Sequence, residues 1–517
     1  MHRFQLNRRV GVNIPLFSLR SAHDWGCGEI PDLVAFSAWG ARAGFSLVQL
    51  LPFHEIWPEE TSPYSALTAF ALDPVFLAFR DVPDFAAAGG IAALGDGAQA
   101  EIESLRRVPA VQWQAVRALK ARAAELAFNH FHQKEWLGKT ARAAELAAYV
   151  KAEQGWLDDF ALYRSLAEEH GPNWGNWPAP LRDREPAALD EARGRLQRTI
   201  LKRQYLEWQL HLQWQAARRE SEKLGVGLAG DLPFVVSRDA ADVWANPRVF
   251  CKGLRLGVPP DAFSADGQDW GLPVFDWRRM VRTRFDWIKR RAARAGALCS
   301  LWRVDHAVGL FRSYYRRDDG GPPGYSPRTE AQHKWLGPKV FAALAGAGEI
   351  VAEDLGDVPD WTRALLTRGG IPGYRVMRWE NDQGVYRDPS RWPALSVATP
   401  GTHDTESQAE WYDSLQPHER QHLFALPGLQ GFELNHPYDA RLRDALLGAV
   451  YGAGSALAII PYGDLAGSRA RVNVPGTIGP HNWTYRMETS IEALAADGAE
   501  VQRLRQLALQ NRRTLGR

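Results

Sequence analysis

Short apolar runs, several of them rich in β-branched residues, recur along this chain of 517 residues, and a stretch with helical periodicity follows each of them. This alternation is typical of successive strand and helix units built around a parallel sheet. Eight such runs occur, so the sequence predicts the α/β class and a (β/α)8 barrel. The predicted strands span residues 10–17, 46–52, 225–236, 297–305, 349–353, 374–379, 395–399 and 456–461.

The second and third predicted strands are separated by roughly 170 residues, far beyond the usual repeat of such a barrel. The interval is rich in Ala, Leu, Glu and Arg at helical spacing, as in residues 143–150 and 201–217. We therefore expect a helical inserted subdomain over residues 80–224. The barrel would then comprise residues 1–79 and 225–517.

A second irregular stretch covers residues 246–277. It combines many Gly, Pro and Asp residues with interleaved aromatic residues. A segment of this length and composition is more than a simple connector. We expect it to form a substrate loop over the mouth of the barrel.

The charge balance is nearly even, because 62 basic and 60 acidic residues are mixed along the chain. This balance does not favour binding to nucleic acid.

Cys27, Cys251 and Cys299 lack the paired spacings of a zinc site or a redox disulfide, so we expect free thiols in a reducing compartment. The sequence has no signal-peptide pattern and no uncharged apolar run of about 18 residues. These features predict a cytoplasmic protein without a membrane partner, and they leave its oligomeric state open.

Acidic residues follow four of the predicted strands. Asp231 lies near the end of the third, Asp305 ends the fourth, Glu353 ends the fifth, and Asp404 follows the seventh. The reacting groups of such barrels lie at the carboxyl ends of the strands, so these side chains are expected on one rim. A single Asp at a strand end is more often a turn former or a helix cap. Four acids together, with arginine and histidine beside them, favour a catalytic site.

This set of residues suits cleavage of a glycosidic bond with retention, which needs a carboxylate nucleophile and a carboxylic acid about 5 Å apart. Arg303 and Asp305 point the same way along an extended strand, so the guanidinium would keep the aspartate ionised and aimed. Asp305 is therefore the predicted nucleophile. Glu353 follows the apolar residues 350–352, where desolvation raises the pKa of a carboxyl group. It is the predicted general acid and base.

His403 and Asp404 are adjacent polar groups that would bind sugar hydroxyls and stabilise an oxocarbenium-like transition state. The competing chemistry is a metal site, since His306 and the same acids are also possible ligands. No HxH or HExxH pattern concentrates such ligands, and no GxxxxGK[ST] or GxGxxG loop offers a cradle for phosphate. We therefore expect neither a metal nor an organic cofactor.

A series of short motifs runs through nearly the whole chain. In order they are SPYSALTAF (62–70), GDLP (230–233), DVWANP (242–247), VPPDAFSADGQDWGLPVFDW (258–277), RVDH (303–306), AEDLG (352–356), IPGYRVMRWE (371–380), GTHD (401–404) and NVPGT (473–477). Together they resemble the amylomaltases, also called disproportionating enzymes or 4-α-glucanotransferases, within the α-amylase superfamily. Strand-end acids occur across that superfamily, whereas the segment 258–277 is particular to the amylomaltases.

The resemblance implies transfer of a segment of an α-1,4-glucan to the 4-hydroxyl of an acceptor glucan or glucose, through a covalent glucosyl-enzyme. It implies the same roles for Asp305, Glu353 and Asp404. It brings Asn473 near the reacting centre, where bracing of a loop is the alternative role. The sugar-binding residues that it implies are Arg303, His306, His403, Tyr64, Asp231, Gln268 and Trp270.

Two other functions stay open from the sequence. An α-glucan hydrolase of the same superfamily shares the acids and differs in whether water or sugar intercepts the intermediate. A catalytically weak glucan-binding protein would keep the fold and lack a catalytic carboxylate, yet all three are present. Ala307 follows RVDH where an aromatic residue is common, and residues 405–407 read Thr-Glu-Ser where Asn and Asp are usual. We therefore expect an altered preference at the sugar subsites.

Overall fold

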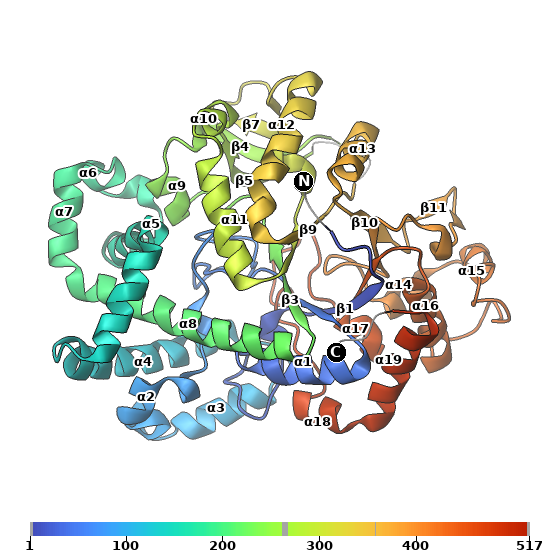
Figure 1. Cartoon of the computed structure of the whole chain (residues 1–517), viewed down its shortest axis with the longest axis horizontal. Helices are drawn as coiled ribbons and strands as arrows, with labels where there is room; N and C mark the ends of the chain where they lie inside the picture. The colour runs from blue at the N-terminus through green and yellow to red at the C-terminus, as the bar shows by residue number, and fades with distance from the viewer. Residues whose placement is uncertain (1–3, 261–266, 357, 514–517) are drawn as a thin grey trace.

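The computed structural model describes residues 4–260, 267–356 and 358–513. Eight parallel strands close into a barrel in the order in which they follow along the chain (Figure 1). Each strand overlaps one of the eight predicted runs, so the prediction of a (β/α)8 barrel is confirmed. The strands are β1 (Arg9–Asn13), β2 (Leu47–Gln49), β3 (Gly227–Leu232), β6 (Leu301–Val304), β9 (Glu349–Ala352), β10 (Gly373–Val376), β13 (Ser396–Thr399) and β14 (Leu457–Pro461).

Helices cover the outside of the barrel between most successive strands. They include α1 (Asp32–Ala43), α11 (Asp286–Leu298), α12 (Glu330–Ala343), α13 (Asp360–Gly369), α16 (Ala440–Tyr451) and α19 (Gly498–Gln510). The interval between β10 and β13 differs, because residues 377–395 form a hairpin of β11 (Asn381–Asp382) and β12 (Val385–Tyr386) and a short 3-10 turn in place of a helix. Gln383 and Gly384 at its tip both have positive φ, which favours a tight hairpin turn.

The helices expected between the second and third strands are present and gather on one side of the barrel (Figure 1). The longest, α5, begins after Thr140, whose side chain caps it, and ends before Gly171, which has a φ of 87°. The last, α8, returns to the barrel, where the Trp214 indole donates to the Leu298 carbonyl at 2.8 Å. In order they are α2 (Pro83–Ala87), α3 (Ala98–Arg107), α4 (Trp113–Phe131), α5 (Ala141–His170), α6 (Ala179–Arg182), α7 (Pro186–Arg195) and α8 (Gln197–Lys223).

The stretch 246–277, expected to be an irregular loop, is mostly regular in the described residues. It forms an antiparallel hairpin of β4 (Phe250–Val258) and β5 (Gln268–Phe275), and residues 261–266 lie outside the described residues. With β7 (Ser313–Arg317) and β8 (Gly324–Ser326) it makes a four-stranded sheet in the order β5-β4-β7-β8. The pairing of β4 with β5 shifts register around Arg255. This shift interrupts the alternation by which a strand is recognised in a sequence.

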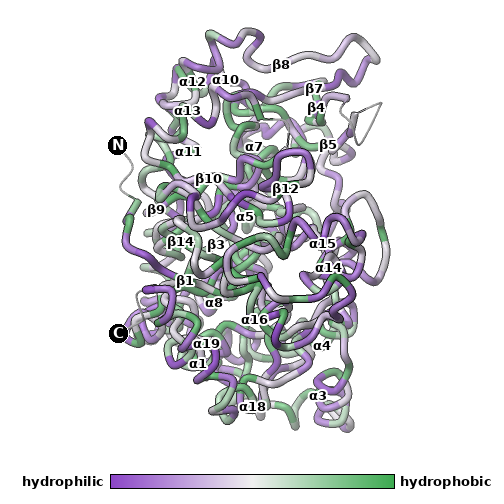
Figure 2. Tube along the Cα trace, turned by 90° about the vertical axis from the view of Figure 1, so that its right-hand side faces the viewer, coloured by the Kyte–Doolittle hydropathy of each residue, from purple (hydrophilic) through white to green (hydrophobic). Residues whose placement is uncertain are grey.

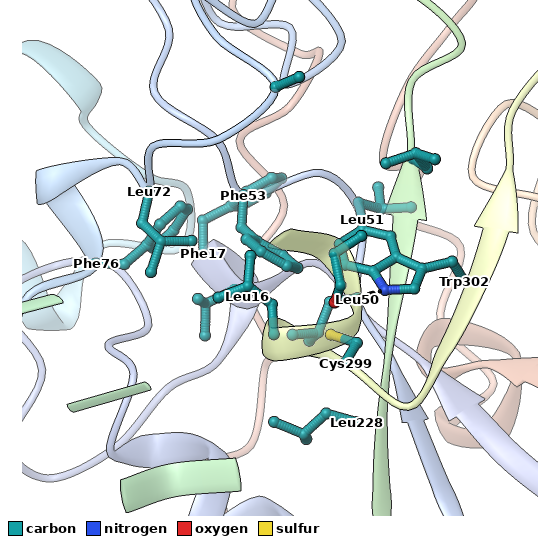
Figure 3. Packing of buried hydrophobic residues seen from close by; sticks show 14 of the residues in the cluster. Leu16, Phe17, Leu50, Leu51, Phe53, Leu72, Phe76, Leu228, Cys299 and Trp302 are labelled. Carbon is teal, nitrogen blue, oxygen red and sulfur yellow. Dashed lines mark hydrogen bonds between the residues drawn. The ribbon is translucent and has the colours of Figure 1, made fainter. Parts of the chain in front are cut away.

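Hydrophobic residues pack between the barrel strands and the surrounding helices, as Figure 3 shows around Trp302. The Trp302 indole points outward from β6, lies 5.8 Å from the Phe53 ring and donates to the Ala295 carbonyl at 3.0 Å. Gly230 on β3 is needed beneath it, because a Cβ there would collide with the indole. Since Trp302 faces outward, its neighbour Arg303 faces into the barrel.

A separate layer of apolar side chains fills the barrel interior, and Figure 2 shows hydrophobic stretches along barrel strands such as β3 and β14. The members of this layer include Leu47, Ala229, Leu301, Val351, Tyr374, Val397, Leu457 and Ile459.

Cys27 and Cys299 are buried free thiols, and Cys251 is a partly buried one. Within the described ranges, no helix has both the length and the apolar character needed to cross a membrane.

Candidate active site

Three polar side chains on neighbouring strands form the floor of the site. On β3, β6 and β9, one apolar residue of each strand fills the barrel interior. The residue two positions further along each chain points the same way and reaches the carboxyl-end rim. The apolar residues are Ala229, Leu301 and Val351, and the polar residues that follow them are Asp231, Arg303 and Glu353.

The Arg303 guanidinium lies between two aspartates. Its Nη1 donates to Asp231 Oδ1 and Oδ2 at 2.8 and 2.7 Å, and to Asp305 Oδ1 at 2.8 Å. Burial alone would lower the pKa of Arg303, but the charges of Asp231 and Asp305 raise it well above its ordinary value. The arginine therefore stays charged and sets the orientation of the Asp305 carboxylate, as the spacing of the two residues predicted.

The two aspartates that share this arginine differ in their access to a ligand. The Asp231 side chain is fully buried, and burial raises its pKa in spite of Arg303. The Asp305 side chain is 22% exposed, while its amide continues the strand ladder by donating to the Leu232 carbonyl at 3.1 Å. Asp305 is thus the aspartate that presents an oxygen to the barrel mouth.

Glu353 lies one residue past the end of β9. Its Oε2 accepts from the His306 amide at 2.8 Å, and its Oε1 accepts from the Leu355 amide at 3.0 Å. Burial raises the pKa of Glu353 to about 7, against the lowering effect of Arg303 and with a further contribution from Asp305. A carboxyl group with a pKa near neutrality can both give and take a proton.

The fourth acid of the site, Asp404, lies in the loop after β13. Asn473 Nδ2 donates to Asp404 Oδ1 at 2.6 Å, and His403 Nε2 lies 3.3 Å from Asp404 Oδ2. The Tyr64 hydroxyl donates to Asp231 Oδ2 at 2.8 Å and lies 3.1 Å from His403 Nε2. Tyr64 therefore connects the buried floor of the site to the loop that carries Asp404, whose side chain is 43% exposed.

Aromatic rings surround His306, which has a left-handed backbone with φ 39° and ψ 52°. Phe234 and Trp270 each make an edge contact with its ring, with centroids 5.1 Å away. The Trp270 indole donates to Gln268 Oε1 at 3.0 Å. The exposed Gln268 is therefore connected to His306 through the Trp270 ring. Burial lowers the pKa of His306, which keeps its imidazole neutral at pH 7.

The structure thus brings the predicted site residues together at one rim, with Gln268 at the edge. Sequence reasoning missed Phe234 and two further aromatic residues, Tyr374 and Trp483. The Tyr374 ring lies 5.9 Å from the guanidinium carbon of Arg303, and Trp483 lies 5.8 Å from the His403 ring. Tyr374 lies within the motif 371–380 and Trp483 lies a short distance after NVPGT, but an aromatic residue in an apolar setting usually belongs to the core. Among the described residues, no group of His, Cys, Asp and Glu side chains is arranged to hold a metal ion.

Comparison with known proteins decides between the families that share such a site. The model of the 4-alpha-glucanotransferase family matches residues 14–492. The chain belongs to the 4-α-glucanotransferase family. The 4-alpha-glucanotransferase of Thermus thermophilus is 32% identical over 445 residues, which cover 82% of this chain and 84% of the relative. That of Chlamydia pneumoniae is 28% identical over 500 residues, which cover 94% of this chain and 92% of the relative.

Solved structures of two amylomaltases share the fold of this 4-α-glucanotransferase. Amylomaltase from Streptococcus agalactiae, solved in complex with acarbose, matches with a TM-score of 0.81 and 23% identity, over 98% of this chain and all of that chain. Amylomaltase from Corynebacterium glutamicum matches with a TM-score of 0.78 and 22% identity, over 97% of this chain and 75% of that chain. The family model and the relative from Thermus thermophilus confirm the resemblance drawn from the sequence motifs.

Proposed function

We propose that this 4-α-glucanotransferase acts on α-1,4-linked maltooligosaccharides in the cytoplasm by a retaining double displacement. One observation carries the mechanism: an arginine-held carboxylate and a carboxylic acid with a pKa of about 7 project from neighbouring strands, as Asp305 and Glu353. Their different environments support different roles. The free thiols of Cys27 and Cys299 are consistent with a reducing compartment.

In the first step, Asp305 is the nucleophile and attacks the anomeric carbon of the donor glucan. Because Arg303 holds Oδ1, we assign the attack to Oδ2. Glu353 gives its proton to the glycosidic oxygen, the bond to the leaving sugar breaks, and a glycosyl ester forms on Asp305.

In the second step, Glu353 takes a proton from the 4-hydroxyl of the acceptor sugar. The resulting oxygen attacks the same anomeric carbon, and Asp305 leaves as a carboxylate. The two inversions restore the α configuration. Water that entered in place of the acceptor would give hydrolysis, so the aromatic wall of Phe234 and Trp270 around His306 supports transfer by excluding it.

The remaining polar groups bind the sugar at the cleavage point. Asp404 is the proposed transition-state stabiliser, since a carboxylate close to the sugar ring favours developing positive charge. Asn473 keeps this carboxylate in place through its amide. The other proposed sugar-binding residues are Tyr64, Asp231, Arg303, His306, His403, Gln268 and Trp270.

Incubation of the purified protein with maltotriose tests the proposal. Chromatography should show glucose and a ladder of maltooligosaccharides longer than the substrate, with few new reducing ends. Shorter sugars with rising reducing ends would instead identify a hydrolase. Unchanged maltotriose would overturn the proposed substrate class.

A further inference from the structure

A surface cavity of about 650 Å³ lies beside the four-stranded sheet, and none of the residues of the candidate active site lines it. It is bordered by β4, β7 and β8, by α10 (Trp277–Arg282) and by the start of α12, all at the top of the view in Figure 2. A volume of this size suits a small molecule. The proposed glucan transfer makes no use of this cavity.

The cavity carries an excess of positive charge. Arg278, Arg282 and Arg328 line it with exposed side chains, and none of their guanidinium groups forms an ion pair with any residue that the structure describes. Among the described residues that line the cavity, the one acid, Asp276, is already engaged, since it accepts from the Arg279 amide at 3.0 Å and lies 3.2 Å from Arg279 Nε. Unpaired guanidinium groups in a concave site favour a phosphate-bearing ligand.

Aromatic side chains share the same lining. Trp335 is 54% exposed although it is a large apolar residue, and Tyr315 and Tyr325 lie on the adjoining strands. Flat aromatic faces pack well against the C–H faces of a sugar ring. Lys339 Nζ lies 4.6 Å from the Trp335 ring centroid, which adds another cation at this edge.

We propose that this cavity binds a small phosphorylated sugar, with its ring against Trp335 and its phosphate among Arg278, Arg282 and Arg328. A neutral glucan has no need of three unpaired cations, so the charge distinguishes this ligand from the substrate of the barrel. The strand β4 lines the cavity through Cys251 and pairs with β5, which carries Trp270 at the active site. The cavity and Trp270 of the aromatic wall therefore share one sheet.

Isothermal titration of the full chain with glucose 1-phosphate and glucose 6-phosphate tests this assignment, with inorganic phosphate and maltose as comparison ligands. At least one sugar phosphate should bind at least about tenfold more tightly than either comparison ligand, and its affinity should fall as NaCl rises. Saturating maltotriose should not displace it. Absence of binding, equal binding of phosphate or maltose, or displacement by maltotriose would each overturn the proposal.

Variants locate the binding site. The double substitution Arg278→Gln and Arg282→Gln, and separately Trp335→Ala, should each weaken binding of the sugar phosphate by about tenfold or more. These side chains are exposed, so the variants should fold, and their transfer from maltotriose should stay at the wild-type rate. Arg219→Gln on α8 is the matched control, because it removes one exposed guanidinium that does not line the cavity and should bind as the wild type does. Unchanged affinity in both cavity variants would refute the site.

Discussion

Arg303 Nη1 lies 2.8 Å from Asp305 Oδ1 while the same nitrogen contacts both carboxylate oxygens of Asp231. The buried Asp231 holds the guanidinium from the neighbouring strand, and the Tyr374 ring lies beside it. The position of the Asp305 carboxylate is therefore set before any sugar binds. Such preorganisation lowers the cost of reaching the transition state.

The substitution Arg303→Lys should lower kcat/KM for maltotriose by roughly 10²- to 10³-fold, because an ammonium group cannot serve both aspartates with the same planar geometry. Steady-state kinetics measure the effect. Arg375→Lys on β10, which β9 separates from β6, is the control, since Arg375 forms no hydrogen bond or ion pair with either aspartate, and it should retain most of the activity. A wild-type rate in the Arg303→Lys variant would show that the arginine has no part in positioning Asp305.

The rate should depend on pH through Glu353, whose pKa is raised to about 7 by burial. The acid form is required for the first step, so kcat/KM should fall as pH rises through about 7. A glycosyl fluoride donor needs no proton on its leaving group. With such a donor, the rate of the first step should no longer fall as pH rises through about 7. A fall at the same pH with both donors would assign it to another group.

Glu353 should also lower the stability of the fold at alkaline pH. Its folded pKa lies above the ordinary value of 4.5, so the folded state binds the proton more tightly than the unfolded state does. Stability therefore decreases as pH rises from about 4.5 through about 7. Glu353→Gln should melt at a higher temperature than the wild type at pH 8, and the difference should shrink toward pH 4. If Glu353→Gln melted at a lower temperature than the wild type at pH 8, burial of the Glu353 charge would not destabilise the fold, and the prediction would be wrong.

Asn473 should act through Asp404. Removal of its amide by Asn473→Ala should lower kcat roughly tenfold or more with a smaller change in KM, because the carboxylate loses a donor that fixes its direction. Asn473→Asp should be worse, since it sets a second negative charge against Asp404. Kinetics on both variants separate the two effects. Equal activity of the Ala and Asp variants would mean that Asn473 only braces its loop.

The fold could be predicted from the sequence where inward and outward residues alternate along a strand and the strand ends at the rim of the barrel. On β6, Leu301 and Arg303 alternate with the outward Trp302, and this pattern places the arginine and Asp305 at the rim. The β4 and β5 hairpin was missed because its glycines and its shift of register near Arg255 hide the alternation. Gly257, for example, is needed where β5 approaches so closely that a Cβ would collide with the Gln268 carbonyl.

Two aromatic contacts of the candidate site and the hydrogen bonds to Glu353 could not be predicted from the sequence. The sequence does not tell whether Tyr374 or Trp483 contacts other core residues or the polar groups of the site, because the direction of an aromatic ring depends on the packing of distant segments. The raised pKa of Glu353 was predictable from its apolar neighbours. The hydrogen bonds to its carboxylate were not, because one comes from the His306 amide, on another strand–loop junction.

Mass spectrometry of a trapped intermediate tests the central claim most directly. In the Glu353→Gln variant, a maltosyl fluoride donor should form the glycosyl ester without an acid, and the ester should persist because no base activates the acceptor. We predict that the peptide containing Asp305 carries the sugar, and that Asp305→Asn in the same background abolishes the label. A sugar on the peptide of Asp231 or Asp404, or rapid turnover with no covalent species, would contradict the assignment of Asp305 as nucleophile.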